Sequence, residues 1–139
     1  MNLNDLIQKY IEIGYNRIDA ISKVAQDIVL FKIGKSRFKN HITIKGGVVM
    51  HNISKDIRRA TRDLDIDFIR YSLEDHSIIK FINMLNNVKD GIKIEIIDTI
   101  TKLHQQDYDG KRVNIRLKDE SNKIIDTKLD IGVHKLFDI

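Results

Sequence analysis

The most constraining feature of the sequence is an alternation of acidic and apolar residues in segment 59–70, RATRDLDIDFIR. Asp63, Asp65 and Asp67 are separated there by Leu64, Ile66 and Phe68. Successive side chains of a β-strand point to opposite faces, so the pattern predicts a strand with carboxylates on one face and apolar side chains in a core. Carboxylates gathered on one face repel one another, and the strand therefore calls for a cation beside it.

The chain has 139 residues, the size of one compact domain, and we expect a single domain over residues 1–139. Hydrophobic residues make up 42% and charged residues 32%, a balance typical of folded globular proteins rather than disordered ones. The absence of cysteine excludes disulfides and thiolate zinc sites, so any bound metal is expected to be a hard cation.

Apolar runs are all shorter than the roughly 20 residues of a membrane span, and the start MNLNDLIQKY lacks the basic region of a signal peptide. We therefore expect a cytoplasmic protein without a membrane partner. The net charge of +4 favours contact with nucleotides or RNA, although many proteins with such a charge bind neither.

Hydrophobic periodicity predicts helices in the N-terminal part of the chain. Residues 4–33 have helical spacing that Gly14 divides in two, and Gly34 is expected to cap the second helix. Segment 41–45, HITIK, is typical of a short strand, and segment 48–53 of a short helix. Residues 74–87 form a further predicted helix, with an apolar stripe of Ile78, Ile79, Ile82 and Leu85.

Beyond Gly91 the periodicity becomes that of strands. Three strand-like segments are separated there by the turn sequences DYDGK, residues 107–111, and KDESNK, residues 118–123. The order of elements predicts an α+β, layered α/β architecture, in which helices pack on a mixed β-sheet and a helical segment comes first.

Carboxylates from two strands are the candidate metal ligands. Asp63 and Asp65 have Cα atoms roughly 6.5 to 7 Å apart on a strand, so both can lean onto Mg²⁺ or Mn²⁺, which prefer oxygen ligands. Asp130 in TKLDIGVH is the candidate third acid, since it alternates with Leu129 and Ile131. Such a set could hold the two ions of a phosphoryl-transfer site.

Glycines and basic residues near these acids are candidate phosphate ligands. Gly46 and Gly47 follow a predicted strand, where they can bring backbone N–H groups to a phosphate or can simply form a tight turn. Lys128 is expected to share the face of Asp130 and to pair with phosphate or stay solvated. Arg59 is expected either to clamp a phosphate or to neutralise the acidic strand.

The order of these features resembles the nucleotidyltransferase superfamily, whose prototype fold is that of DNA polymerase β. Its pattern is a strand ending in Gly-Gly or Gly-Ser, a helix, Asp-apolar-Asp on a second strand and a lone Asp on a later one. More narrowly, IKGGVVM followed by RATRDLDIDF is similar to the AbiEii/AbiGii toxin family, where Lys-Gly-Gly precedes an Arg-x-Ser/Thr-x-Asp-apolar-Asp block. Arg59, Thr61, Asp63 and Asp65 occupy that block in order.

The resemblance implies transfer of a nucleoside monophosphate from an NTP, with Mg²⁺ or Mn²⁺, to an acceptor such as RNA or tRNA. It also implies the toxin of a bacterial toxin–antitoxin or abortive-infection system, with an antitoxin as partner. Asp63 and Asp65 would hold the metals, Asp130 would be the third acid and assist the attacking hydroxyl, and Gly46 and Gly47 would cradle the triphosphate. Family members usually continue into a helical C-terminal region, so this chain could be the N-terminal part of a longer protein.

Two alternative functions stay open. One is a catalytically inactive member of the same fold that binds nucleotide or RNA through the basic loops 34–40, GKSRFKN, and 54–62, SKDIRRATR. The other is an antitoxin-like interaction protein, in which the acids form an electrostatic contact surface.

Overall fold

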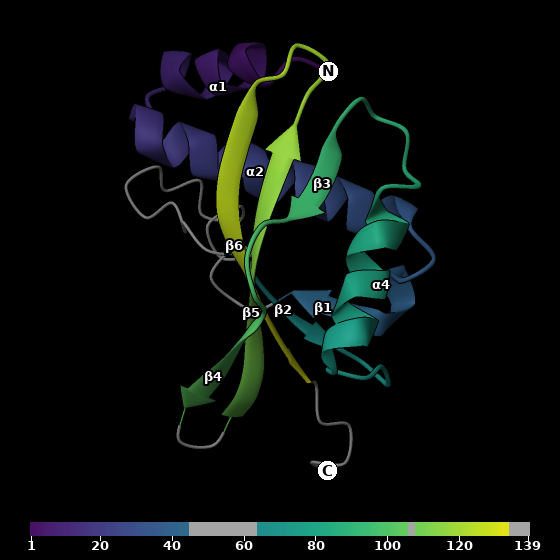
Figure 1. Ribbon diagram of the computed structural model, residues 1–139. Helices are drawn as coiled ribbons and strands as arrows, with labels where there is room; N and C mark the ends of the chain where they lie inside the picture. Colours follow the sequence, from purple (N-terminus) through teal and green to yellow (C-terminus); the bar gives the residue numbers. More distant parts are fainter. Residues whose placement is uncertain (45–63, 106–107, 134–139) are drawn as a thin grey trace.

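The structure is a computed structural model, and it describes residues 1–44, 64–105 and 108–133. The described elements run in the order α1 (Leu3–Glu12), α2 (Arg17–Lys35), the 3-10 helix η1 (Lys39–His41), β1 (Ile42–Ile44), β2 (Leu64–Phe68), α4 (Asp75–Leu85), β3 (Lys93–Ile96), β4 (Thr101–Gln105), β5 (Tyr108–Lys118) and β6 (Ile124–Val133) (Figure 1). The predicted α+β architecture is confirmed. Among the described helices, none combines the length and the apolar composition needed to cross a membrane.

The N-terminal helices begin and end largely where the sequence predicts. Gly14 lies between α1 and α2 with a φ of 114°, a left-handed conformation that side chains other than glycine's rarely tolerate. The predicted cap at Gly34 is wrong, because α2 continues to Lys35 and ends at Ser36. The hydroxyl of Ser36 donates to the Ile33 carbonyl at 2.8 Å and so satisfies a carbonyl of the last helical turn. Ser36 thus takes the capping role that was expected of Gly34.

The six described strands form one mixed sheet in the order β1-β2-β6-β5-β3, with β4 also paired to β5. Strands β2 and β6 are parallel, whereas the other pairs are antiparallel. The strand predicted at 41–45 is confirmed as β1, and the helix predicted at 48–53 lies outside the described residues. The parallel pair joins two segments that are far apart in the sequence and places them at the centre of the sheet.

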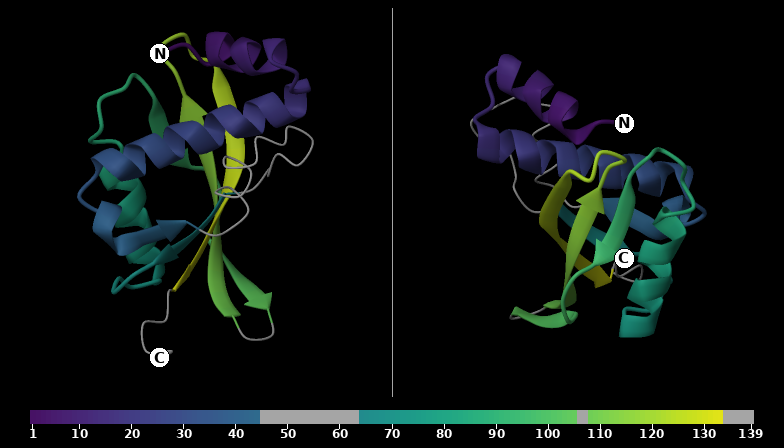
Figure 2. Two further views of the ribbon diagram at one scale, coloured as in Figure 1. Left: turned by 180° about the vertical axis from the view of Figure 1, so that it is seen from behind. Right: turned by 45° about the horizontal axis from the view of Figure 1, so that its top comes forward.

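One face of the sheet is apolar and carries the helices. Helix α2 crosses this face, and α1 packs on α2 (Figures 1 and 2). Helix α4 reaches the same face through Phe81, whose ring centroid lies 5.2 Å from that of Phe68. Buried strand residues line this face: Leu64, Ile66, Phe68, Val113, Ile115, Leu117, Ile125, Leu129 and Ile131. The alternation predicted for the acidic strand is thus confirmed, since its apolar residues enter the core.

Helix α4 forms where the sequence predicts, but its buried stripe differs by one residue. Ile79 is 45% exposed, and Phe81 is fully buried instead. The stripe consists of Ile78, Phe81, Ile82 and Leu85. The aromatic ring of Phe81 packs edge to face against the ring of Phe68, so this side of the helix faces the sheet.

The C-terminal strands form a hairpin whose turn is fixed by Asp119. The predicted turn at 118–123 is confirmed. Of the predicted turn at 107–111, residues 108–111 belong instead to β5, which pairs there with β4, and Asp107 lies outside the described residues. Asp119 is buried, and its carboxylate accepts from the backbone N–H groups of Ser121 at 2.8 Å, Lys123 at 3.0 Å and Leu3 at 2.8 Å. Desolvation by burial raises the pKa of Asp119, but these hydrogen bonds outweigh it and leave the pKa below its usual value.

Candidate functional site

The polar face of the sheet carries those predicted site residues that the structure describes. Asp65 lies on β2, and Lys128 and Asp130 lie on β6. Their side chains point to the sheet face opposite to that of the neighbouring apolar residues. Those neighbours are buried: Leu64 is 4% exposed and Leu129 is 1% exposed. The other predicted site residues, Gly46, Gly47, Arg59 and Asp63, lie outside the described residues.

Asp65 and Asp130 are direct partners across the parallel pair β2–β6. Neighbouring strands are about 4.8 Å apart, so the two carboxylates start from adjacent Cα positions and project to the same face. Both side chains are partly exposed. Asp67, the next acid along the strand, pairs with Gly132 and is only 9% exposed, so it is less accessible than Asp65.

Arg112 holds the Asp130 carboxylate from the other side. It is the partner of Asp130 across the antiparallel pair β5–β6. Its Nε donates to Oδ1 at 2.7 Å and its Nη2 donates to Oδ2 at 2.9 Å, a bidentate arrangement. The side chains of Arg112 and Asp130 are 32% and 13% exposed. A row across three strands therefore reads Arg112, Asp130, Asp65, with one guanidinium beside two acids.

A second bidentate pair lies on the same two strands, nearer the turn. Arg116 Nε donates to Oδ1 of Asp126 at 2.8 Å, and Nη2 donates to Oδ2 at 3.1 Å. These hydrogen bonds lower the pKa of Asp126 and raise the pKa of Arg116. Lys128 lies between the two pairs, opposite Asn114, and its side chain is exposed. Lys128 is thus accessible to an anionic ligand and shares the face of Asp130, as the alternation predicts.

The chemistry of the donor set suits a hard divalent cation. Asp65 and Asp130 offer four carboxylate oxygens from adjacent strands, and oxygen is the ligand atom that Mg²⁺ and Mn²⁺ prefer. In the part of the chain that the structure describes, no three His, Cys, Asp or Glu side chains are grouped closely enough to hold a metal. Asp65 and Asp130 are therefore two candidate ligands for such an ion, and the third predicted acid, Asp63, lies outside the described residues.

Arg112 is the site residue that the sequence-based reasoning missed. The signal was present in the turn KDESNK, because Arg112 and Asp130 lie at equal sequence distances from Ser121 of that turn and face each other once the hairpin register is centred there. The pairing of Asp65 with Asp130 has no such local signal. It depends on β6 joining β2 in parallel across a long crossover.

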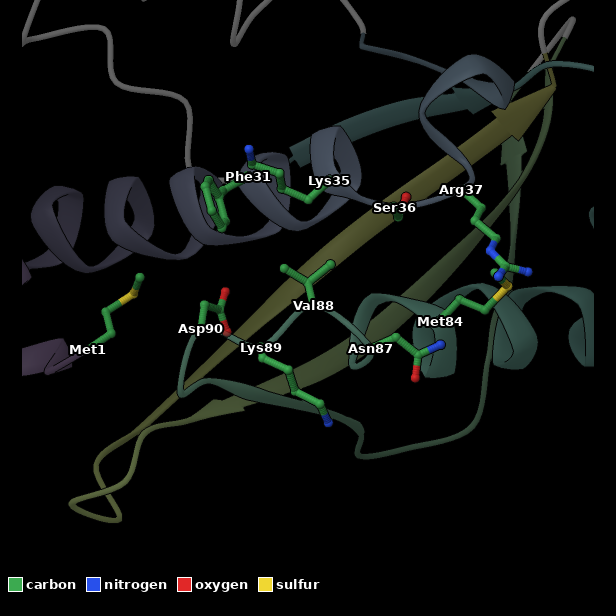
Figure 3. A pocket seen from close by; sticks show the side chains of 10 residues that line it. All are labelled: Met1, Phe31, Lys35, Ser36, Arg37, Met84, Asn87, Val88, Lys89 and Asp90. Atoms are coloured by element: carbon green, nitrogen blue, oxygen red, sulfur yellow. The ribbon is translucent and has the colours of Figure 1, made fainter.

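A large pocket lies elsewhere in the described part of the chain, between the C-terminal end of α2 and the loop before β3. It has a volume of about 830 Å³, and Lys35, Arg37 and Lys89 line it together with the half-exposed Phe31 (Figure 3). Lys35, the last residue of α2, and Arg37 both belong to segment 34–40, for which the sequence predicts a basic loop. The Lys35 Nζ lies 5.8 Å from the centroid of the Phe31 ring.

A buried ion pair lies beneath this pocket. Lys32 Nζ donates to Asp90 Oδ1 at 2.7 Å and to the carbonyls of Val88 at 3.2 Å and Ile92 at 2.8 Å. The side chains of Lys32 and Asp90 are 0% and 5% exposed. Asp90 also lines the pocket, but Lys32 neutralises its charge. The other charged side chains of the lining are basic, so the pocket has a positive net charge.

Comparison with known proteins identifies the family. The family model described as "Nucleotidyl transferase AbiEii toxin, Type IV TA system" matches residues 28–137, a range that begins within α2 and includes the whole described sheet and the row of Arg112, Asp130 and Asp65. No curated protein and no solved structure matches the chain. Since the family model covers well over half of the sequence, the chain belongs to the AbiEii nucleotidyl transferase toxin family of type IV toxin–antitoxin systems.

Proposed function

We propose that the protein is a metal-dependent nucleotidyltransferase that transfers a nucleoside monophosphate from an NTP to an RNA acceptor, as the toxin partner of a cognate antitoxin. The observation that carries this proposal is the direct pairing of Asp65 with Asp130 on the polar face of the sheet. Membership of the AbiEii family supports the reaction class. The NTP dependence, the metal and the RNA acceptor are parts of the proposal.

In the proposed reaction the acceptor hydroxyl oxygen forms a bond to the α-phosphorus, and the bond between that phosphorus and the bridging oxygen of the pyrophosphate breaks. Pyrophosphate leaves with the bonding electrons, and Asp130 receives the hydroxyl proton and passes it to solvent. Bound Mg²⁺ or Mn²⁺ would supply charge neutralisation for the phosphates. Lys128, exposed on the same face, pairs with a phosphate oxygen as a point charge.

The chain's own contribution is positioning and charge. Asp65 and Asp130 are fixed by a parallel ladder whose apolar side is buried, so their relative placement changes little when a ligand arrives. Such preorganised charge accounts for most of the catalysis expected in phosphoryl transfer, which needs no covalent nucleophile. The predicted roles of Gly46, Gly47, Arg59 and Asp63 complete the proposed site.

The test is an incubation of the protein with each of the four labelled NTPs, bacterial RNA and Mg²⁺, followed by electrophoresis of the RNA. We expect label in RNA with the native protein and none with Asp65→Asn. The matched control is Asp126→Asn, which removes an acid from the same face outside the proposed site and should keep full activity. Equal labelling by Asp65→Asn and the native protein would contradict the assignment.

A second candidate function is RNA binding without catalysis, and the basic pocket favours it. Lys35, Arg37 and Lys89 can contact phosphates while Phe31 offers a face for base stacking, a combination typical of sites for single-stranded nucleic acid. For a pure binding protein, RNA affinity should fall steeply with salt, should ignore divalent metal and should drop in Arg37→Ala. Transfer of label that survives in Arg37→Ala but disappears in Asp65→Asn would reject this candidate in favour of the enzyme.

A further inference from the structure

The row of Arg112, Asp130 and Asp65 contains two acids and one guanidinium, and that guanidinium binds Asp130 in a bidentate manner. Both oxygens of Asp130 accept a hydrogen bond from Arg112, at 2.7 and 2.9 Å. Asp65 stands directly opposite Asp130 on the next strand. Like charges on adjacent strands destabilise each other, and a fixed cation at this point offsets that repulsion. Arg112 thus occupies, in electrostatic terms, the role that a metal ion would take.

The same guanidinium also opposes a metal ion. A divalent cation that uses the oxygens of Asp130 comes close to the guanidinium bound to those oxygens, and the two positive charges repel each other. A bidentate arginine is a strong and directional partner for a carboxylate. A cation without an accompanying anion therefore has to compete with Arg112 for Asp130.

We propose that Arg112 is a built-in counterion of the Asp65–Asp130 pair, which a divalent cation must displace from Asp130 and which thereby couples metal binding to the arrival of an anionic nucleotide. This inference rests on the proposed function for the identity of the nucleotide. The phosphates that accompany the metal give the released guanidinium a new bidentate partner. Arg112 is a positioning residue in this scheme, because it acts on Asp130 and on the metal through charge.

The pair Arg116–Asp126 provides a matched control on the same two strands. It has the same bidentate geometry, with distances of 2.8 and 3.1 Å. The described part of β2 begins opposite Leu129, so it does not extend to Asp126. A substitution of Arg116 therefore removes a similar contact with no effect on the charge beside Asp65.

The test is a titration of the whole chain with Mn²⁺ alone, followed by electron paramagnetic resonance, in the absence of nucleotide. We expect Arg112→Gln to bind Mn²⁺ about tenfold more tightly than the native protein, because a positive charge near the ion is gone. Arg112→Lys keeps the charge and should bind Mn²⁺ nearly as the native protein does. Arg116→Gln should be unchanged. Mn²⁺ binding by Arg112→Gln that is equal to or weaker than that of the native protein overturns the proposal.

A measurement on the native protein keeps the proposal falsifiable if Arg112→Gln fails to fold. The Nε–H groups of arginines can be followed by NMR while Mg²⁺ and a non-hydrolysable NTP analogue are added. The Arg112 signal should shift and its hydrogen exchange should accelerate, while the Arg116 signal stays constant. An unchanged Arg112 signal, together with shifts in the amide signals of Asp65 and Asp130, would mean that the metal binds without displacing the guanidinium.

The outcomes separate this inference from the proposed function. Tighter Mn²⁺ binding by Arg112→Gln in a protein that labels no RNA would support the counterion and refute the transferase. RNA labelling that requires Asp65, together with unaltered Mn²⁺ binding in Arg112→Gln, would support the transferase and refute the counterion proposal. Absence of Mn²⁺ binding at millimolar concentrations in the native protein and in every variant would refute the counterion proposal as well.

Discussion

The β5–β6 hairpin carries two Arg–Asp pairs whose local geometry is nearly the same but whose surroundings differ. Arg116–Asp126 lies toward the turn, with side chains 37% and 45% exposed, and Arg112–Asp130 lies toward the centre of the sheet, with side chains 32% and 13% exposed. Only the second pair has an acid of β2, Asp65, as its direct neighbour among the described residues. The comparison teaches that the same bidentate Arg–Asp contact is a surface ion pair near the turn but part of the candidate site where β2 places Asp65 beside it.

The largest expected difference between the pairs is in catalysis. Asp130→Asn should lower nucleotide transfer at least about 100-fold, because it removes a proposed metal ligand and proton acceptor. Asp126→Asn should leave the transfer rate within twofold of the native value, roughly the scatter expected for a surface substitution. Initial rates of RNA labelling measure both. Equal losses of activity in the two variants would remove the functional distinction between the pairs.

The next largest expected effect is on the free energy of unfolding, and it comes from the turn that the two pairs share. Asp119→Asn keeps one acceptor oxygen but loses the charge and the acceptor for the Leu3 N–H, and it should destabilise the protein by about 1–3 kcal/mol. Because Asp119 fixes the turn that sets the register of both pairs, urea unfolding should show a lower midpoint with an unchanged slope. An unchanged midpoint would mean that the ladder holds its register without this turn.

A smaller difference is expected in the strength of the two pairs. A double-mutant cycle of Arg112→Gln and Asp130→Asn should give a coupling free energy of about 1–2 kcal/mol, because the pair is partly shielded from water. The cycle of Arg116→Gln and Asp126→Asn should give a smaller coupling, since exposed ion pairs contribute little. The free energy of unfolding in urea measures each variant. A stronger coupling in the exposed pair would reverse the ranking that burial predicts.

The smallest effect concerns pH. The pKa of Asp126 is lowered in the folded protein, so its pairing stabilises the fold above the unfolded-state pKa of about 3.9. That contribution should be lost as the pH falls through the lower, folded-state pKa. The stability difference between the native protein and Arg116→Gln should therefore be constant above about pH 5 and shrink below about pH 4. Thermal unfolding across this range measures it, and a difference that grows in acid would contradict the assigned direction.

The sequence predicts the local elements well because their signals are local. The alternation around Asp65 predicts a strand with a buried apolar face, and the residues flanking Gly14 predict two helices. Its errors occur where several local solutions are available. Ser36 ends the helix that Gly34 was expected to end, and Phe81 is buried where Ile79 was expected, because packing against Phe68 decides which side of the helix turns inward.

For the site, the sequence by itself determined which side chains are available. Asp65 and Asp130 each lie between apolar residues in the sequence. The two-residue period of a strand, which is a property of the backbone, therefore places both carboxylates on the polar face. Only the tertiary structure decided that these two acids are direct partners and that Arg112 flanks one of them. The physical reason is that strand order and register result from burying the apolar faces of β2, β5 and β6 together against α2 and α4, which is a property of the whole sheet.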